Sequence, residues 1–122
     1  PLAGTLPTTR EQVIKLGLQD AVASNRPFGA PIEAIRSKDP QLISDLVALC
    51  QRTIDEDGAE LLVFGCASMS LLLDDIAEQI PVPVINAVKL SLKAAEMLVG
   101  AGLSHSPVTF PTPAKLVRAQ AA

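Results

Sequence analysis

The feature that most restricts the fold of this chain is an unbroken apolar run, Leu-Leu-Val-Phe, at residues 61–64. It lies between the turn residues Gly58-Ala59 and the pair Gly65-Cys66. A continuous rather than alternating run is typical of a strand that is buried on both faces, as in a parallel sheet. Parallel strands need a crossover connection between them, most often a helix. The run therefore predicts an α/β fold.

Apolar periodicity on either side of this strand predicts alternating helices and strands. Thr8 or Thr9 is the expected cap of a first helix, and Asp39-Pro40 and Gly58 are typical of the start and end of a second. The order α-β-α-β-α-β-α indicates a doubly wound parallel sheet of about three to four strands with helices on both faces. The expected helices cover residues 10–23, 40–57, 70–80 and 87–101, and the expected strands cover residues 31–35, 60–64 and 82–85.

Composition excludes several classes of partner. The chain has 122 residues, 48% of them hydrophobic, so it can bury the core of one domain. Its formal net charge is only −3, and Lys and Arg are scattered singly, which argues against nucleic-acid binding. No apolar run reaches the roughly 18–20 residues that span a bilayer, and no signal-peptide pattern is present. We expect a soluble cytoplasmic protein with no nucleic-acid or membrane partner.

The two cysteines, Cys50 and Cys66, are expected to be free thiols. They lie sixteen positions apart and the chain has a single histidine, His105, so neither a CxxC pair nor a zinc site can be assembled. Cys50 falls on the apolar stripe of the helix at residues 40–57, where a thiol behaves as a small hydrophobe in the core. We expect no metal, and we expect His105 to lie in an exposed loop.

Cys66 has a position that suits acid–base chemistry, because a strand ends there and a helix is expected to begin. The positive end of a helix dipole and free backbone amides favour thiolate over thiol. The same amides could stabilise an enolate while the thiol moves a proton next to a carbonyl group. The alternative is that Cys66 only fills the corner between strand and helix, since free Cys is among the most buried residue types.

Three blocks of sequence resemble the C-terminal part of hydantoin and allantoin racemases, within the aspartate/glutamate/hydantoin racemase superfamily. The blocks are residues 58–69 (GAELLVFGCASM), 81–88 (PVPVINAV) and 102–106 (GLSHS), in the family's order and at its separations. The resemblance is firmest over residues 55–106. It implies a cofactor-independent racemase of a hydantoin-type small molecule, built as two pseudo-symmetric α/β lobes that each supply one Cys.

The resemblance also implies roles for individual parts of the chain. Residues 1–106 would be the second lobe, and residues 107–122 a linker and short helix that pack on the missing N-terminal lobe. Cys66 would be the second catalytic thiol. Family members usually self-associate, so we expect a homo-oligomer. The implied substrate-binding residues are Ala67, Ser68, Thr5, Thr8 and Thr9.

Two departures from the family pattern stand out, because Ser68 replaces a glycine and Asn86 replaces an aspartate. Both bear on substrate fit and neither removes the thiol. The alternatives are an aspartate or glutamate racemase, an enzyme that resembles arylmalonate decarboxylase, or a non-catalytic α/β binding module. The residue that matches Cys66 in the other lobe would discriminate among them. We expect the isolated 122-residue chain to be inactive, because half of the implied pocket is missing.

Overall fold

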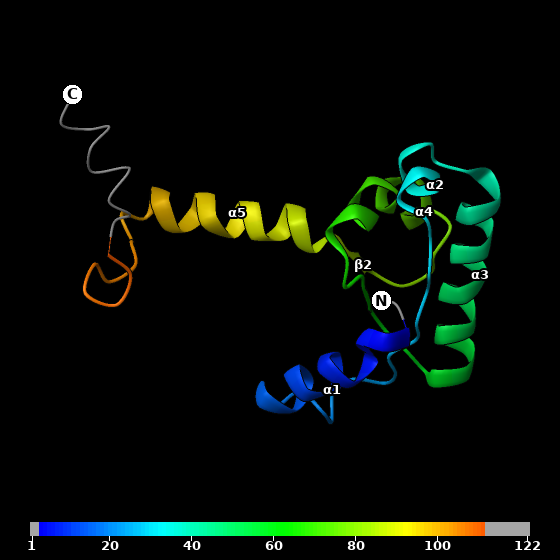
Figure 1. The fold of residues 1–122 in the computed structure, drawn as a ribbon, viewed down its shortest axis with the longest axis horizontal. Coiled ribbons are helices and arrows are strands. Elements are labelled where there is room, and N and C mark those ends of the chain that lie inside the picture. The colour runs from blue at the N-terminus through cyan, green and yellow to red at the C-terminus, as the bar shows by residue number, and fades with distance from the viewer. Residues whose placement is uncertain (1–2, 112–122) are drawn as a thin grey trace. The chain divides into compact units, whose positions relative to one another are not determined.

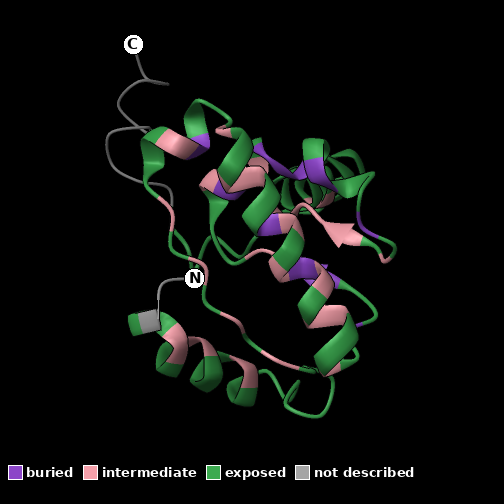
Figure 2. Ribbon diagram, turned by 90° about the vertical axis from the view of Figure 1, so that its right-hand side faces the viewer, coloured by how far each residue is buried: buried purple, intermediate pink, exposed green. Residues whose placement is uncertain are grey.

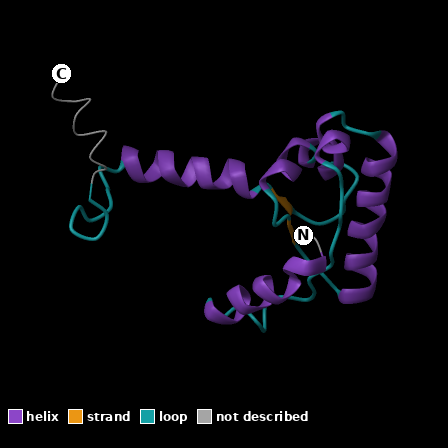
Figure 3. Cartoon of the chain, viewed as in Figure 1, coloured by secondary structure: helices purple, strands orange, loops and turns teal. Residues whose placement is uncertain are grey.

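The computed structural model describes residues 3–111 as an α/β chain with a small parallel sheet (Figures 1 and 3). The chain divides between Leu90 and Ser91 into two compact units. The short helix expected near the C-terminus, within residues 114–120, lies outside the described residues. The elements are η1 (Ala3–Thr5), α1 (Leu6–Lys15), α2 (Ile32–Arg36), α3 (Pro40–Asp57), β1 (Leu62–Val63), η2 (Ala67–Leu71), α4 (Leu73–Ala77), β2 (Val84–Ile85) and α5 (Ala87–Gly100).

The sheet consists of β1 and β2, which pair in parallel with Leu62 opposite Val84 and Val63 opposite Ile85. The expected parallel pairing of these two segments is confirmed. The expected count of three to four strands is not reached in residues 3–111, where the sheet has two strands. The strand predicted at residues 31–35 is wrong, because α2 occupies this segment and packs against η2.

The long helix α3 begins and ends at the residues that the sequence predicts. The Asp39 carboxylate accepts hydrogen bonds from the amides of Gln41 (2.8 Å) and Leu42 (3.2 Å), which otherwise lack partners in the first turn. Gly58 ends the helix with φ +68°, a left-handed conformation that glycine adopts without a Cβ penalty.

Helix α1 differs from its prediction at both ends. It begins at Leu6 with Thr5 as its cap, so the prediction of Thr8 or Thr9 as the cap is wrong. It ends at Lys15, well before residue 23, because Gly17 takes φ +68° and the Leu18 amide closes the terminus on the Val13 carbonyl at 3.0 Å. A glycine in this conformation stops a helix even where the apolar periodicity continues.

The core is formed mainly by side chains of the segment that follows β1 and by the inner face of α3 (Figure 2). Leu72, Ile76 and Ile80 are buried, and η2 and the short α4 replace the single helix predicted for residues 70–80. The core consists of two clusters of buried residues, the first made of Ile35, Leu46, Met69, Leu72, Leu73 and Ile76 and the second of Cys50, Ala59, Leu62 and Ile80.

Burial of β1 on both faces is not observed. Leu62 is 9% exposed and packs in the second cluster, whereas Val63 on the opposite face is 62% exposed. Helix α5 confirms the prediction for residues 87–101, but it has no buried residue, and Leu90 on its expected apolar face is 58% exposed. Val63 and Leu90 are therefore exposed apolar side chains of the first unit. None of the helices in residues 3–111 has the length and apolar character to cross a membrane.

A charged cluster joins the segment after α1 to the end of α3. Arg26 donates two hydrogen bonds to the Asp57 carboxylate, at 2.6 and 2.8 Å, and one to Glu56 at 2.6 Å. Ser24 donates a further bond to Asp57 at 2.6 Å. The Arg26 guanidinium, and then the Ser24 hydroxyl, lower the pKa of Asp57 to about 2. This cluster holds carboxylates at a helix C-terminus, where the helix dipole alone disfavours negative charge.

Candidate active site

Cys66 lies just beyond the C-terminal end of β1, as the sequence predicts. Its backbone is extended, with φ −132° and ψ 126°, and η2 begins at the next residue. The side chain is exposed and carries a free thiol. The carboxyl ends of strands are the usual place for a ligand on a parallel sheet, so the thiol is in a position to meet a small molecule.

The closest partner of this thiol is the hydroxyl of Ser68. The Cys66 Sγ and the Ser68 Oγ are 3.0 Å apart, a hydrogen-bond distance for a sulfur atom. The Ser68 hydroxyl, and next the backbone amides of Ser68 and Met69, lower the pKa of the Cys66 thiol, because all of them stabilise the thiolate. From the sequence, Ser68 is expected only to contact the substrate, and not the thiol.

The helix expected directly after Cys66 is a single short stretch of 3₁₀-helix, η2. A five-residue 3₁₀-helix offers little macrodipole, so the local donors account for the stabilised thiolate. The Met69 amide bonds to the Cys66 carbonyl at 3.1 Å and closes this turn. Ala67 is exposed between the two residues, and its assignment as a substrate-binding residue stays a prediction.

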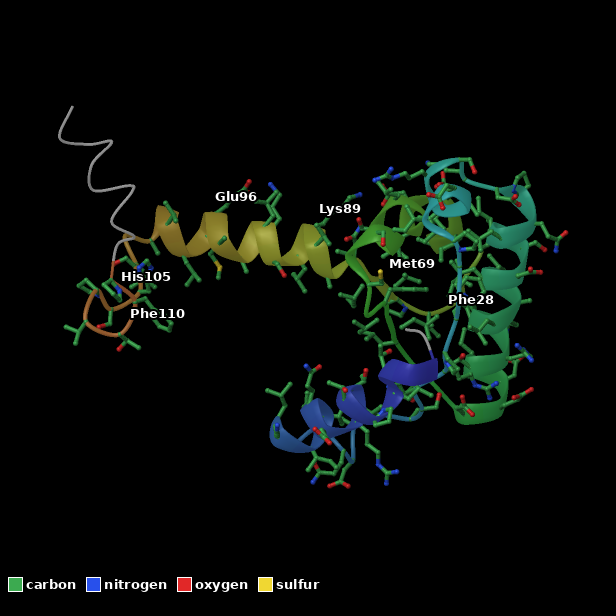
Figure 4. All side chains as sticks on the ribbon, viewed as in Figure 1. Phe28, Met69, Lys89, Glu96, His105 and Phe110 are labelled. Atoms are coloured by element: carbon green, nitrogen blue, oxygen red, sulfur yellow. The ribbon has the colours of Figure 1, made fainter. Side chains whose placement is uncertain are left out.

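Met69 anchors the turn in the core. Its side chain is 7% exposed and belongs to the first cluster, against which the partly buried Phe28 packs (Figure 4). Cys66 is thus an exposed thiol next to a fixed segment. An acid–base group needs this combination of access and positioning.

Cys50 differs from Cys66 in every relevant property. It is 4% exposed, it packs with Leu62 and Ile80, and burial raises the pKa of its thiol. The prediction that Cys50 is a core residue is confirmed. A neutral thiol in this place cannot act as a base for a substrate.

Asn86 directly follows β2, at the same edge of the sheet as Cys66. Its Oδ1 accepts a bond from the Lys89 amide at 3.2 Å and so caps α5, and its Nδ2 lies 3.5 Å from the Ser70 carbonyl of η2. An amide can make both contacts, whereas a carboxylate can make only the first. The sequence signal for the cap was an Asn placed directly before a predicted helix.

The three threonines predicted to bind the substrate lie at the start of α1. Thr5 is its cap, Thr8 and Thr9 fall in its first turn, and the Thr9 hydroxyl donates to the Thr5 carbonyl at 3.0 Å. Their assignment as substrate-binding residues stays a prediction. A hollow of about 700 Å³ lies beside α1, and Cys66 is not among its lining residues, which are Leu6, Arg10, Val13, Ile14, Gln19, Val22, Ala23, Ser24 and Asn25.

The remaining polar candidates lie on the surface. Asp74 pairs with Lys89 at 2.6 Å, Asp75 pairs with Lys38 at 2.7 Å, and both carboxylates are exposed, as is Glu78. In the second unit, His105 lies in an exposed loop, as expected, with its ring edge against Phe110 (Figure 4). Within residues 3–111, no three His, Cys, Asp or Glu side chains are grouped as a metal site requires.

Comparison with known proteins gives one consistent result. Residues 2–95 match the family model described as Asp/Glu/Hydantoin racemase. The chain is 35% identical over 108 residues to a hydantoin racemase of Rhizobium meliloti and covers 88% of itself and 44% of that relative. It is 28% identical over 109 residues to a hydantoin racemase of Paenarthrobacter aurescens, with 86% and 46% covered.

Solved structures agree with these sequence matches. An allantoin racemase from Klebsiella pneumoniae superposes with a TM-score of 0.75 at 28% identity, over 86% of this chain and 43% of that one. An allantoin racemase from Pseudomonas fluorescens superposes with a TM-score of 0.74 at 32% identity, over 93% and 48%. The chain thus spans about half the length of the relatives that it matches.

Proposed function

Because the chain belongs to the Asp/Glu/hydantoin racemase family, we propose that it forms one lobe of a racemase that acts on a hydantoin-type substrate. Cys66 is one of the two acid–base groups of this enzyme. The observation that carries the proposal is an exposed thiol at the end of β1 whose neighbours lower its pKa.

The reaction follows from the chemistry of a thiolate beside backbone amides. The Cys66 thiolate removes the proton from the carbon next to a carbonyl group, and the electron pair moves onto the carbonyl oxygen as an enolate. Amides of Ala67 and Ser68 donate hydrogen bonds to this oxygen. A second thiol on the opposite face returns a proton to the carbon, so that configuration is inverted. Each step exchanges one proton and requires no cofactor.

The second thiol belongs to the N-terminal lobe, which together with this chain makes up a protein of the family's usual length. The coverage of 43–48% of each relative supports this reading. In the complete enzyme, further strands extend the β1–β2 sheet and helices cover both of its faces. The same proposal takes residues 1–106 as one lobe and residues 107–122 as a segment that docks on the other lobe. It also includes self-association and a cytoplasmic location.

A hydantoin-type substrate is favoured over an amino acid. The relatives and solved structures described above are hydantoin and allantoin racemases. The turn at residues 66–70 carries no charged side chain, which suits an uncharged ring bounded by carbonyl and N–H groups. An aspartate or glutamate substrate would instead need cationic partners for its carboxylates.

The test is the Cys66→Ser variant of the complete two-lobe protein, with Cys50→Ala as the matched control. A hydroxyl is a much weaker acid than a thiol, so we expect Cys66→Ser to lower the racemisation rate by about 10²–10⁴-fold. Decay of optical rotation measures the rate, and deuterium exchange from each enantiomer separates the two faces. More than about a tenth of the original rate in Cys66→Ser would refute the role of Cys66. Rapid turnover by the 122-residue chain alone would refute the two-lobe proposal.

A further inference from the structure

We infer that Ser68 is a positioning residue for this reaction, whose hydroxyl holds the Cys66 sulfur at the strand end and donates a hydrogen bond to the thiolate. The inference rests on the proposed function of Cys66. It assigns to Ser68 a role toward the thiol in addition to any contact with the substrate. In the family pattern that the sequence resembles, this position is a glycine, which has no hydroxyl.

The contact is held in place from both ends. Cys66 has extended backbone geometry, and the 3.1 Å bond from the Met69 amide to the Cys66 carbonyl closes the turn between the two residues. Met69 is buried in the first core cluster, and Ser68 directly before it is half-buried. The Ser68 Oγ therefore approaches the sulfur at 3.0 Å from a fixed segment of the chain.

Ser68 favours the reactive form of Cys66. A serine hydroxyl can donate to a thiolate or accept from a thiol, and a bond to the charged acceptor is the stronger of the two. In keeping with this difference, the Ser68 hydroxyl is the largest cause of the lowered pKa of Cys66. When Cys66 takes the substrate proton, the hydroxyl keeps its own proton and rotates from donor to acceptor. Ser68 therefore stabilises the base without exchanging a proton with the substrate.

The test measures the pH dependence of Cys66 alkylation in the 122-residue chain. Ser68→Ala, Ser68→Gly and Ser68→Thr are compared in a Cys50→Ala background, with iodoacetamide as the probe. We expect Ser68→Ala to slow alkylation at pH 7 by about fivefold and to move the midpoint of the profile to higher pH. The limiting rate at high pH should stay the same, and Ser68→Thr should restore the original midpoint. A merely structural role would change access and rate without moving the midpoint.

The inference is overturned if Ser68→Ala leaves the midpoint unchanged, or if Ser68→Thr fails to restore it while circular dichroism shows a folded chain. Ser68→Gly provides the same comparison if Ser68→Ala does not fold. Alkylation needs no turnover, so the two proposals can fail separately. A shifted midpoint with full racemisation by Cys66→Ser removes the proposed function and with it the catalytic role of Ser68, although the contact still stabilises the thiolate. Loss of racemisation in Cys66→Ser with no effect of Ser68 on the midpoint removes this inference alone.

Discussion

A short pulse of iodoacetamide at neutral pH should label Cys66 and leave Cys50 almost unlabelled. Cys66 is exposed and the pKa of its thiol is lowered, whereas Cys50 is 4% exposed and burial raises the pKa of its thiol. The rate of alkylation depends on the thiolate fraction and on access to the sulfur, and both of these favour Cys66 over Cys50. The two cysteines thus provide an internal comparison in a single folded sample.

The expected ratio follows from the contacts of Cys50. Reagent reaches this thiol only if α3 separates from β1, which exposes Leu62 and Ile80 of the second cluster. Burial of one such side chain is worth about 1.5–3 kcal/mol, so this opening costs at least about 3 kcal/mol. Since 1.4 kcal/mol corresponds to a factor of ten, Cys50 should react at least about a hundredfold more slowly than Cys66.

Peptide mapping by mass spectrometry after quenched pulses gives both rates. Cys50→Ala should leave the fast reaction intact, and Cys66→Ser should remove it. In guanidinium chloride, the two thiols should react at similar rates, which controls for intrinsic reactivity. A ratio below about ten in the native chain would contradict the placement of Cys50 in the core and of Cys66 at the exposed strand end.

Three further predictions concern stability, each measured by chemical denaturation. Leu72→Ala should destabilise the chain by about 3–5 kcal/mol because Leu72 is fully buried. Leu92 is exposed, so Leu92→Ala should cost less than about 0.5 kcal/mol. Equal effects of the two substitutions would contradict the placement of Leu72 in the core. The pKa of Asp57 is lowered to about 2 in the folded chain, so its contribution to the free energy of unfolding is present above the unfolded pKa of about 3.9 and is lost as pH falls toward 2. Asp57→Asn should therefore flatten the dependence of stability on pH in this range. An unchanged dependence would exclude the Arg26–Asp57 cluster as its source. Lys38 has φ +52°, a left-handed conformation that strains any residue with a Cβ atom. Lys38→Gly should be about 1 kcal/mol more stable than Lys38→Ala, because both variants lose the ion pair with Asp75 and only glycine removes the strain. Equal stability of the two variants would show that the strain is negligible.

Local sequence signals predicted those elements that local chemistry controls. Helix α3 is the clearest case, because Asp39 and Gly58 satisfy its terminal groups whatever surrounds them. The strand prediction for residues 31–35 was wrong because a short apolar run fits a strand or a helix equally well. Burial of Ile35 against η2 decided in favour of the helix, and this contact is tertiary.

The same distinction applies to the candidate site. The position of Cys66 at a strand end could be predicted, because the apolar run and the following Gly65 are visible in the sequence. The 3.0 Å contact with Ser68 could not be predicted, since it depends on a 3₁₀ turn where a regular helix was expected. The cluster of Arg26 with Asp57 had no sequence signal either, because it joins residues 31 positions apart, with α2 and most of α3 between them.

The two-stranded sheet has a practical consequence for anyone who handles this chain. In residues 3–111 both strands are edge strands, so each presents unpaired backbone groups on its outer side. Val63 on this small sheet and Leu61 directly before β1 are exposed, and an apolar edge of this kind is a template for strand addition by another molecule. The chain produced by itself should therefore aggregate as its concentration rises, and co-expression with the proposed N-terminal lobe should keep it in solution.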